Sequence, residues 1–435
     1  MKTKVIIPLI AVCLLCGCSD VNYIYRKEAD STVNLRLCWN WSDSGTKSET
    51  FTEIVDLYSN KTPSVNIESE YYKDDTFYQK LQVDFSSGNP PDIISARFGN
   101  LISGLLNNGR LADLSGLYAQ SDGYLTKLIE SDAVNDLSAG GKIYGLPLER
   151  TYVYLYINND IFNYCSAKVP ETFAELDEAV AKIRANNIVP IAFDASSDKY
   201  LYQAIVSRIS ESMSDNGKVS ESAYVEGLDY IKHLHSIGAF SSNCMLSSEE
   251  QQNSLFLDKK AAMIVRDSGF INIMSAYNPD NSLSGTSSTA PFTVISFPQK
   301  NEIKSGDYSI VLNSYLSTFG DLTFYVSADC YKNEFKKKAA NGFLSYLTNE
   351  TNIDLMLQNG MILSTVTHGK ISETLSPLAT QMKLNIISAH DITQMPGIIA
   401  PENIWSRDIT EKMIPLFHGE TTAKAMTDNL FSDIK

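Results

Sequence analysis

The first quarter of the chain alternates between two hydrophobic periods, and this alternation limits the folds that the chain can adopt. Residues 32–42 (TVNLRLCWNWS) place apolar side chains at every second position, which is typical of a β-strand. Residues 50–60 (TFTEIVDLYSN) instead carry apolar residues at helical spacing, and Thr50 with Glu53 predicts a capping box at the start of that helix. A second strand is predicted over residues 64–72 (SVNIESEYY).

The same alternation continues as far as Gly109. A helix is predicted over residues 75–87, a short apolar strand follows in PDIISA, and another helix is predicted over residues 98–108. Repeated strand–helix units are typical of a parallel α/β sheet, and such sheets bind ligands at the carboxyl ends of their strands. The loops after Trp41 and after Ser95 are therefore candidate ligand loops.

The α/β pattern recurs in the second half, so we predict two α/β lobes. Thr172 and Glu175 predict a capping box at the start of a helix in PETFAELDEAVAKIRANN. The remaining expected elements are a long β-rich run over residues 152–157, strands over 188–195, 261–265, 292–298 and 317–327, and helices over 199–212, 221–237, 247–257 and 333–350, with mostly helical structure after that. Residues 280–291 are expected to form a polar loop.

The N-terminus carries a pattern of protein export. Two lysines precede about a dozen apolar residues, which is shorter than the roughly 20 residues of a membrane-spanning helix and typical of a secretory signal. The stretch ends in Leu15-Cys16-Gly17-Cys18, which resembles the bacterial lipobox, whose last cysteine is lipidated. We expect residues 1–17 to be a signal peptide, Cys18 to carry the lipid, and residues 18–31 to form the anchor and tether. An uncleaved membrane anchor is the alternative, and it places the protein on the same outer face of a membrane.

Charge excludes one class of partner. The formal net charge is −15, and removal of Lys2 and Lys4 with the signal peptide makes it −17. A chain this acidic does not bind nucleic acid or an anionic bilayer by general electrostatics. We therefore expect no nucleic-acid partner, and membrane contact through the lipid on Cys18.

Common catalytic and metal-binding signatures are missing from the sequence. It contains no H-E-x-x-H, no G-x-x-x-x-G-K-[ST], no G-x-G-x-x-G and no G-x-S-x-G. The cysteines after Cys18 are far apart without a C-x-x-C pair, so we expect buried thiols at Cys38, Cys165, Cys244 and Cys330. No catalytic residue, metal or cofactor is predicted.

Several blocks, taken in order, resemble a known family. The most telling are SGNPPDII (87–94), PETFAEL (170–176) and the F-x-x-x-K-A-A-M pattern of residues 256–263. Together with the lipobox, and over roughly residues 32–365, their order and spacing are similar to those of bacterial extracellular solute-binding proteins of ABC importers, of the maltose-binding type. The resemblance implies a two-lobed periplasmic-binding-protein-like fold that holds a sugar in its cleft and performs no chemistry.

The resemblance also implies how the lobes are divided. Lobe 1 is expected over residues 32–148 plus 316–362, and lobe 2 over 149–315 plus 363–435, with LERTYVYLYIN as a crossing strand. Each lobe is expected to be a mainly parallel sheet flanked by helices. The implied partner is the transmembrane part of an ABC permease, and the protein is expected to be a monomer, lipid-anchored at the outer face of the cell membrane.

A sugar site needs carboxylates, amides or guanidinium groups for the hydroxyl rim and aromatic rings for the apolar face. The strand ends supply the candidates Trp41, Asp43, Arg97, Phe98, Glu149, Thr151, Asp194, Asp267, Ser268 and Phe270, and Trp405 could cap the cleft. Thr151 falls where the maltose-binding type carries a cleft carboxylate, which argues against maltodextrin specificity. Trp39 fits the core better than a ligand site, Trp41 fits both equally, and Arg97 could instead pair with a surface carboxylate.

Two functional classes compete at this point. The first is a binding protein for a carbohydrate, an oligosaccharide in particular, with a polyol, glycerol phosphate or a peptide as other ligands. The second is a secreted lipoprotein glycoside hydrolase, which needs two carboxylates about 5–10 Å apart. The 51 Asp and Glu residues leave such a pair open, but nothing in the sequence singles one out, and the order of the blocks favours the binding protein.

Overall fold

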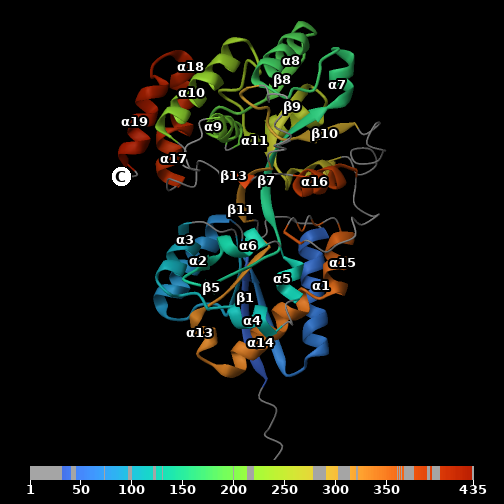
Figure 1. The fold of residues 1–435 in the computed structure, drawn as a ribbon, viewed down its shortest axis with the longest axis vertical. Coiled ribbons are helices and arrows are strands. Elements are labelled where there is room, and N and C mark those ends of the chain that lie inside the picture. Colours follow the sequence, from blue (N-terminus) through green and yellow to red (C-terminus); the bar gives the residue numbers. More distant parts are fainter. Residues whose placement is uncertain are drawn as a thin grey trace, which may run out of the picture.

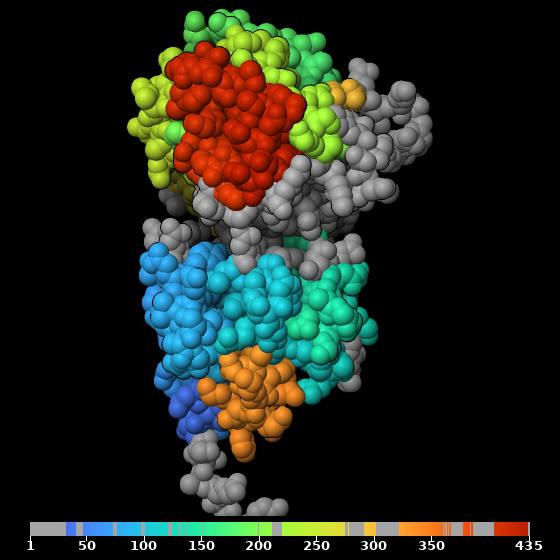
Figure 2. All heavy atoms as spheres, turned by 90° about the vertical axis from the view of Figure 1, so that its left-hand side faces the viewer, coloured from blue at the N-terminus to red at the C-terminus, as the bar shows by residue number. Residues whose placement is uncertain are grey.

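The computed structural model describes residues 32–433 with the exception of internal gaps. The gaps are residues 41–45, 73, 97–99, 121–123, 130, 199, 213–219, 278–290, 302–313, 320–321, 360, 362, 364, 367–376, 389–391 and 394–401. The helices and strands form two lobes, and β7 (Arg150–Asn158) with β11 (Ser314–Phe319) runs between them (Figure 1). Figure 2 shows the coloured parts of the lobes as separate masses, one above the other. The predicted two-lobed α/β fold is confirmed.

The first lobe is built on a five-stranded sheet in the order β2-β1-β3-β12-β6. Its strands are β1 (Val33–Trp39), β2 (Val65–Tyr71), β3 (Ile93–Ser95), β12 (Thr323–Val326) and β6 (Leu146–Pro147), with a separate hairpin of β4 (Ser138–Ala139) and β5 (Lys142–Ile143). Its helices are α1 (Thr46–Lys61), α2 (Asp74–Ser87), α3 (Asn100–Asn107), α4 (Ser115–Gln120), α5 (Tyr124–Leu128), α6 (Ser131–Asp136), α13 (Ala328–Tyr331), α14 (Glu334–Leu347) and α15 (Glu350–Gln358). β1 is parallel to β2 and β3, as predicted, whereas β12 runs antiparallel to β3 and β6.

The second lobe is built on a six-stranded sheet in the order β13-β11-β7-β9-β8, with β10 also on β7. Its other strands are β8 (Val189–Ala192), β9 (Ala261–Asp267), β10 (Phe292–Ile295) and β13 (Ile392–Thr393). Its helices are α7 (Asn159–Tyr164), α8 (Phe173–Ala185), α9 (Leu201–Ser212), α10 (Glu221–Ser236), α11 (Glu249–Leu257), α12 (Phe270–Tyr277), α16 (Pro377–Ser388), α17 (Glu402–Asp408), the 3₁₀ helix η2 (Thr410–Lys412), α18 (Met413–His418) and α19 (Ala423–Asp433). β9, β10 and β11 all run antiparallel to β7, so both sheets are mixed and the mainly parallel arrangement is limited to part of each.

The predicted periodicities place side chains correctly, but one helix start is wrong. In β1, Leu35 and Leu37 are fully buried, as the period of two requires. Helix α1 begins at Thr46, so Thr50 lies inside the helix and is buried, and no capping box forms there. The first turn of α1 is polar, which is why the apolar period revealed only the later part of the helix. Half of the capping box predicted for α8 is present, because the Thr172 side chain accepts a hydrogen bond from the Glu175 amide at 3.2 Å. The Glu175 carboxylate accepts from the Glu171 amide, one residue before the cap, at 2.8 Å.

The crossing strand β7 is buried on both faces. Its even-numbered residues from Tyr152 to Tyr156 pack in one apolar cluster, and the odd-numbered residues from Val153 to Ile157 pack in another. The first lobe has a core of its own that reaches as far as Leu363 and Val366. The residue limits predicted for the lobes stay a prediction, and these two residues, assigned by it to lobe 2, are buried in the core of the first lobe.

The four cysteines of the described chain are buried free thiols, as predicted: Cys38, Cys165, Cys244 and Cys330. Burial raises the pKa of the Cys330 thiol to about 12. In the part of the chain that the structure describes, no helix combines the length and the apolar character needed to cross a bilayer. The predicted signal peptide, Cys18 and the tether lie outside the described residues.

Candidate functional site

One edge of the first sheet faces the second lobe. Because β1, β2 and β3 are parallel, their carboxyl ends share this edge, where Trp39 is in register with Tyr71 and Ser95. β6 is antiparallel to β12, which is itself antiparallel to β3, so β6 also ends at this edge. The chain continues from β6 into β7 and crosses to the other lobe (Figure 1). Parallel α/β sheets bind ligands at this kind of edge.

Two aromatic residues mark the carboxyl ends of β1 and β2. Trp39 is buried, and its indole Nε1 donates a hydrogen bond to the Ser69 hydroxyl at 2.8 Å, so the core interpretation of Trp39 is confirmed. The ring of Tyr71 lies 5.0 Å from the Trp39 ring and is 44% exposed. Asn40 follows β1, and its buried side-chain oxygen accepts no hydrogen bond within the described part of the chain.

Glu149 lies at the same edge, directly before β7. Its carboxylate forms an ion pair with Lys47 at 3.0 Å, with 13% of the Glu149 side chain and 15% of the Lys47 side chain exposed. Lys47 stands in the first turn of α1, immediately after the loop that follows β1. The pair therefore connects the first turn of α1 to the residue directly before the crossing strand.

The corresponding edge of the second sheet faces back toward the first. β8 and β9 are parallel and share a carboxyl edge, whereas β9 is antiparallel to β7 with Asp267 opposite Val153. Val153 is three residues from Arg150, where β7 begins, and this corresponds to about 10 Å along a strand. The strand pairing therefore places Asp267 near the Glu149 end of β7.

A buried charged network supports the second edge. The Arg266 guanidinium donates to the Asn253 side-chain oxygen and to the Val265 carbonyl, each at 2.8 Å, and lies 3.6 Å from the Asp198 carboxylate. Asp198 also accepts a hydrogen bond from the Leu201 amide at the start of α9. Burial raises the pKa of Asp198 to about 6, because desolvation outweighs the opposing effect of Arg266 at this distance.

This network holds Asp267 in a defined position. Tyr200 donates its hydroxyl hydrogen to one Asp267 carboxylate oxygen at 3.0 Å, and the Gly269 amide donates to the other at 2.9 Å. The Arg266 guanidinium lies 5.8 Å from the centre of the Tyr200 ring. An ionised carboxylate has about four acceptor positions, so Asp267, which is half-buried, can accept further hydrogen bonds from ligand hydroxyl groups.

Ser268 follows Asp267 and is buried against the crossing strand. Its amide donates to the Tyr152 carbonyl at 2.7 Å, and its hydroxyl accepts from the Tyr152 amide at 3.4 Å. Ser268 therefore extends the pairing between β7 and β9 by one residue and fixes the turn that carries Asp267.

Three predicted site residues have structural roles in this structure. Asp194 is buried and accepts hydrogen bonds from the Ser196 amide and from the hydroxyls of Ser196 and Ser197, which shapes the turn after β8. Phe270 is 2% exposed and packs edge-on against Tyr156. Trp405 is 8% exposed and stacks on Tyr202 in the core of the second lobe. Their side chains are occupied by these contacts, and we leave all three out of the proposed ligand set.

Four predicted site residues lie outside the described residues: Trp41, Asp43, Arg97 and Phe98. For Thr151 the structure gives the backbone pairing with Thr318 and nothing of the side chain. Sequence reasoning missed other residues of the two edges, namely Lys47, Tyr71, Asp198, Tyr200 and Arg266. Tyr71 could have been found, because it is the last residue but one of the strand predicted over residues 64–72, as Trp41 is in the strand predicted over residues 32–42. Arg266 directly precedes Asp267 in the same strand end, but neither its partner nor its burial is visible in the sequence.

Within the described ranges, no group of three or more His, Cys, Asp or Glu side chains is arranged to hold a metal ion. What the two edges offer is a set of carboxylates, an amide and tyrosine rings. These groups bind hydroxyl-rich or amide-rich small molecules.

Comparisons with known proteins agree with this arrangement. Residues 42–353 match the family described as bacterial extracellular solute-binding protein. Among curated proteins, the chain is 26% identical over 228 residues to a Brucella abortus protein with a provisional description as a binding protein. The matched region covers 49% of this chain and 53% of that protein. It is also 26% identical over 133 residues to the maltodextrin-binding protein of Bacillus subtilis. That match covers 30% of this chain and 29% of the Bacillus subtilis protein. The chain spans about half the length of the curated relatives it matches first.

Solved structures share the fold over nearly the whole chain. A protein from a study of xylan utilisation by Caldanaerobius polysaccharolyticus has a TM-score of 0.71 at 20% identity and covers 93% of this chain and all of that chain. RafE in complex with raffinose has a TM-score of 0.67 at 17% identity, with 92% and 98% covered. Since the family match spans most of the sequence and the fold agrees with it, this chain belongs to the bacterial extracellular solute-binding protein family and is a binding protein rather than an enzyme.

Proposed function

We propose that the protein is the substrate-binding subunit of an ABC importer, and that it captures a carbohydrate between its lobes and delivers it to a membrane permease. The observation that supports this most strongly is the pair of strand edges that lie near the start of β7. One edge offers Tyr71 and the Glu149 carboxylate, and the other offers the oriented Asp267 carboxylate. Carboxylates accept hydrogen bonds from several sugar hydroxyls, while an exposed aromatic ring covers the apolar face of a sugar.

An oligosaccharide is the favoured ligand. The separation of about 10 Å along β7 between Asp267 and the first edge exceeds what a single small polyol spans, so a ligand of two or more sugar units fits it better. The ligands named in the descriptions of related proteins include maltodextrin, raffinose, chitin oligosaccharide and acarbose. Trp41, Asp43, Arg97, Phe98 and Thr151 stay predictions as further ligand contacts.

Ligand capture would be coupled to the arrangement of the lobes. A sugar that contacts both edges stabilises the arrangement in which both can reach it, and the shift is limited by the difference in affinity between the two arrangements. β7 and β11 connect the lobes, so small changes of backbone angle at their ends would move one lobe relative to the other.

The location of the protein follows from the family and from the N-terminal pattern. The family is described as extracellular, which places the protein outside the cytoplasm. We propose in addition that Cys18 carries the lipid that anchors the protein, as a monomer, to the outer face of the cell membrane. Stable anchoring requires more than one acyl chain, and a diacylated cysteine provides it.

The test is thermal unfolding of residues 22–435 against a panel of mono- and oligosaccharides, with glycerol phosphate, other polyols and peptides included. A ligand that binds only the folded state stabilises it by about 2.7 kcal/mol at a hundredfold excess over Kd, so a matching sugar should raise Tm by several degrees. The Asp267→Asn variant should lose most of this shift. The matched control is Asp160→Asn, since Asp160 is an exposed carboxylate of the second lobe that pairs with Lys259.

The outcomes separate the alternatives. One sugar that shifts Tm and is recovered unchanged supports the proposal and identifies the ligand. A shift by glycerol phosphate, another polyol or a peptide keeps the binding protein and replaces its ligand class. A sugar that is consumed, with products appearing, contradicts a role in binding alone.

A further inference from the structure

We propose that the end of the first lobe opposite the ligand edge docks on an anionic phospholipid surface. The surface in question, called the basic pole below, consists of Lys332, Phe335, Lys337 and Lys338 around the start of α14. This inference rests on the proposed membrane location, and it adds an orientation to it.

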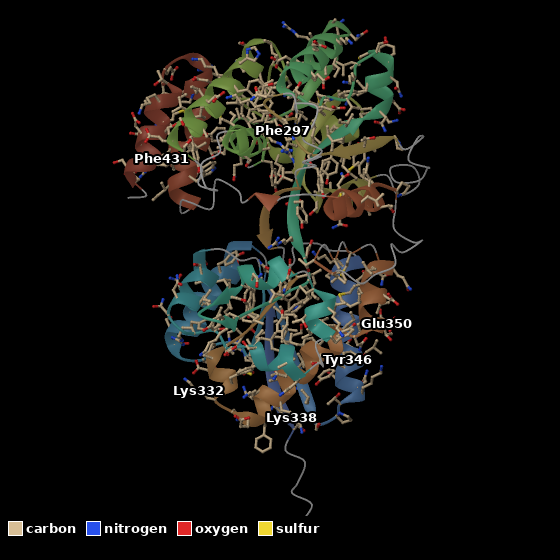
Figure 3. The ribbon with its side chains drawn as sticks, viewed as in Figure 1. Phe297, Lys332, Lys338, Tyr346, Glu350 and Phe431 are labelled. Carbon is tan, nitrogen blue, oxygen red and sulfur yellow. The ribbon has the colours of Figure 1, made fainter. Side chains whose placement is uncertain are left out.

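The position of the basic pole follows from the strand directions. β12 runs antiparallel to β3, so the chain leaves β12 at the amino end of β3, and α13 and α14 follow there. The Lys336 ammonium confirms this placement, because it binds the Asp92 carboxylate, just before β3, at 2.9 Å. In Figure 3, Lys332 and Lys338 lie at the end of the first lobe that is farthest from the second lobe. The basic pole and the ligand edge are therefore at opposite ends of the same sheet.

The charge of this segment contrasts with that of the whole chain. Residues 332–338 (KNEFKKK) contain four lysines and one glutamate, a formal charge of +3 in a chain of −15. Lys336 is used internally by Asp92. Lys332 and Lys337 are 75% and 40% exposed, and they pair with Asp329 and Glu334, respectively. The Lys337 ammonium also lies 5.3 Å from the centre of the Tyr331 ring. Surface ion pairs of this kind contribute little and can be exchanged for a phosphate partner.

Lys338 and Phe335 complete the surface. Lys338 is exposed, and no ion pair or hydrogen bond of its side chain occurs within the described part of the chain. Phe335 follows the Asn333 cap of α14 and is 72% exposed, which is unusual for a residue that is normally buried. An exposed phenyl ring between lysines is the combination that inserts into the headgroup region of an anionic bilayer.

The chain outside the structure brings this surface close to a membrane. β1 begins at Val33, at the amino edge of the sheet, and α14 packs against β1. The thirteen residues between Cys18 and Thr32 reach at most about 45 Å. A lipid on Cys18 therefore keeps the amino edge within this distance of the bilayer. Salt screens the negative charge of distant parts of the protein beyond about 8 Å, so the local lysines decide the sign of the interaction at contact.

Docking through the basic pole would hold the first lobe upright on the membrane. The ligand edge would then point away from the bilayer, and the second lobe would lie above it. In this orientation the space between the lobes stays accessible to solutes while the protein waits for its ligand.

The experiment measures the depth of a tryptophan at position 335. The full-length chain carrying Phe335→Trp is mixed with vesicles of one part brominated phosphatidylglycerol to two parts phosphatidylcholine. The fluorescence of the unsubstituted chain under the same conditions is the reference, so that the difference reports the tryptophan at position 335. The matched control is Tyr164→Trp, because Tyr164 is 73% exposed on α7 of the second lobe. We expect quenching of the tryptophan at position 335 and none of the one at 164.

Removal of charge should abolish the signal. Each lysine near an anionic surface strengthens binding about fivefold, so Lys332→Ala, Lys337→Ala and Lys338→Ala together should lower the docking constant roughly a hundredfold. The docking constant should be lowered to a similar extent when the unsubstituted lysines meet vesicles of pure brominated phosphatidylcholine. Equal quenching at positions 335 and 164, or quenching that is unchanged without phosphatidylglycerol, would overturn the proposal. Quenching that requires a permease in the vesicle would assign the surface to a protein partner instead. The sugar-dependent Tm shift is read separately, so either proposal can fail alone.

Discussion

The two strand edges near the start of β7 differ in how much of their charge is buried. In the second lobe, Arg266 and Asp198 are each only 5% exposed, and they stand behind the Tyr200 and Asp267 side chains that reach the edge. In the first lobe, the Lys47–Glu149 pair keeps 15% and 13% of its side-chain surface exposed. The second edge is therefore built as a supported, pre-organised site, whereas the first edge keeps groups that can exchange partners.

This difference determines what a substitution should change. Removal of one partner from a buried ion pair leaves an uncompensated charge and costs about 3–5 kcal/mol. Removal of one partner from a pair that water reaches costs about 1 kcal/mol or less. Substitutions in the buried Arg266–Asp198 pair behind the second edge should thus affect stability first, and substitutions of Glu149 at the first edge should affect ligand affinity first.

The largest effect is expected for Arg266→Leu. This change leaves Asp198 buried without its cation, so we expect the free energy of unfolding to fall by about 3–5 kcal/mol, measured by urea denaturation. The double variant Arg266→Leu with Asp198→Asn is the matched control. It should recover part of the loss, because it removes the uncompensated charge. A loss of less than about 1 kcal/mol for Arg266→Leu would remove the distinction between the edges.

The second effect is a pH dependence that belongs to Asp198. Its pKa is about 6 in the folded protein and about 3.9 in an unfolded chain, so the folded state binds the proton more tightly. The stability from this group is fully present below about pH 4 and is lost as the pH rises through 6, a change of about 3 kcal/mol. Urea denaturation from pH 4 to pH 7 should show this decrease in the parent and a smaller one in Asp198→Asn. Superimposable pH profiles would contradict the assignment, and Asp160→Asn serves as the exposed control.

The sequence predicted the architecture better than it predicted the site. Hydrophobic periods identified β1, β2 and α2, because burial of one face imposes a regular spacing on each of them. The crossing strand β7 was identified from its long β-rich run, since both of its faces are buried. The rule that ligands bind at strand ends led to Glu149 and Asp267, and the structure places both near the start of β7. Their contact with a ligand stays a prediction. The start of α1 was missed because its polar first turn carries no apolar period.

Single side chains were harder to assign, for a physical reason. A strand end alternates between residues that face the edge and residues that pack against neighbouring helices, and the sequence does not show which neighbours are present. Phe270 and Trp405 were predicted as ligand contacts, but both rings pack against aromatic partners from other elements, Tyr156 and Tyr202. Arg266 depends on Asp198, which lies 68 positions away along the chain (266 − 198), and only the fold brings the two together.

The smallest effect on stability is expected at the first edge, for Glu149→Gln. The substitution keeps the size of the side chain and removes the charge that Lys47 binds, so the free energy of unfolding should fall by about 1 kcal/mol or less. Affinity for the sugar identified in the thermal panel should fall about tenfold or more, because a hydrogen bond to a charged group contributes about 1.5–3 kcal/mol. Titration calorimetry measures the affinity and urea denaturation measures the stability.

Lys47→Met is the control that separates loss of the ion pair from loss of the Glu149 carboxylate. It breaks the same ion pair but leaves the Glu149 carboxylate in place, so it should match Glu149→Gln in stability and lower the sugar affinity less. Equal losses of affinity in both variants would mean that the ligand responds to the pair as a structural unit and not to the carboxylate. If Glu149→Gln instead left affinity unchanged and cost more than about 2 kcal/mol of stability, the first edge would be built like the second. Ligand recognition would then depend on the loops after β1 and β3.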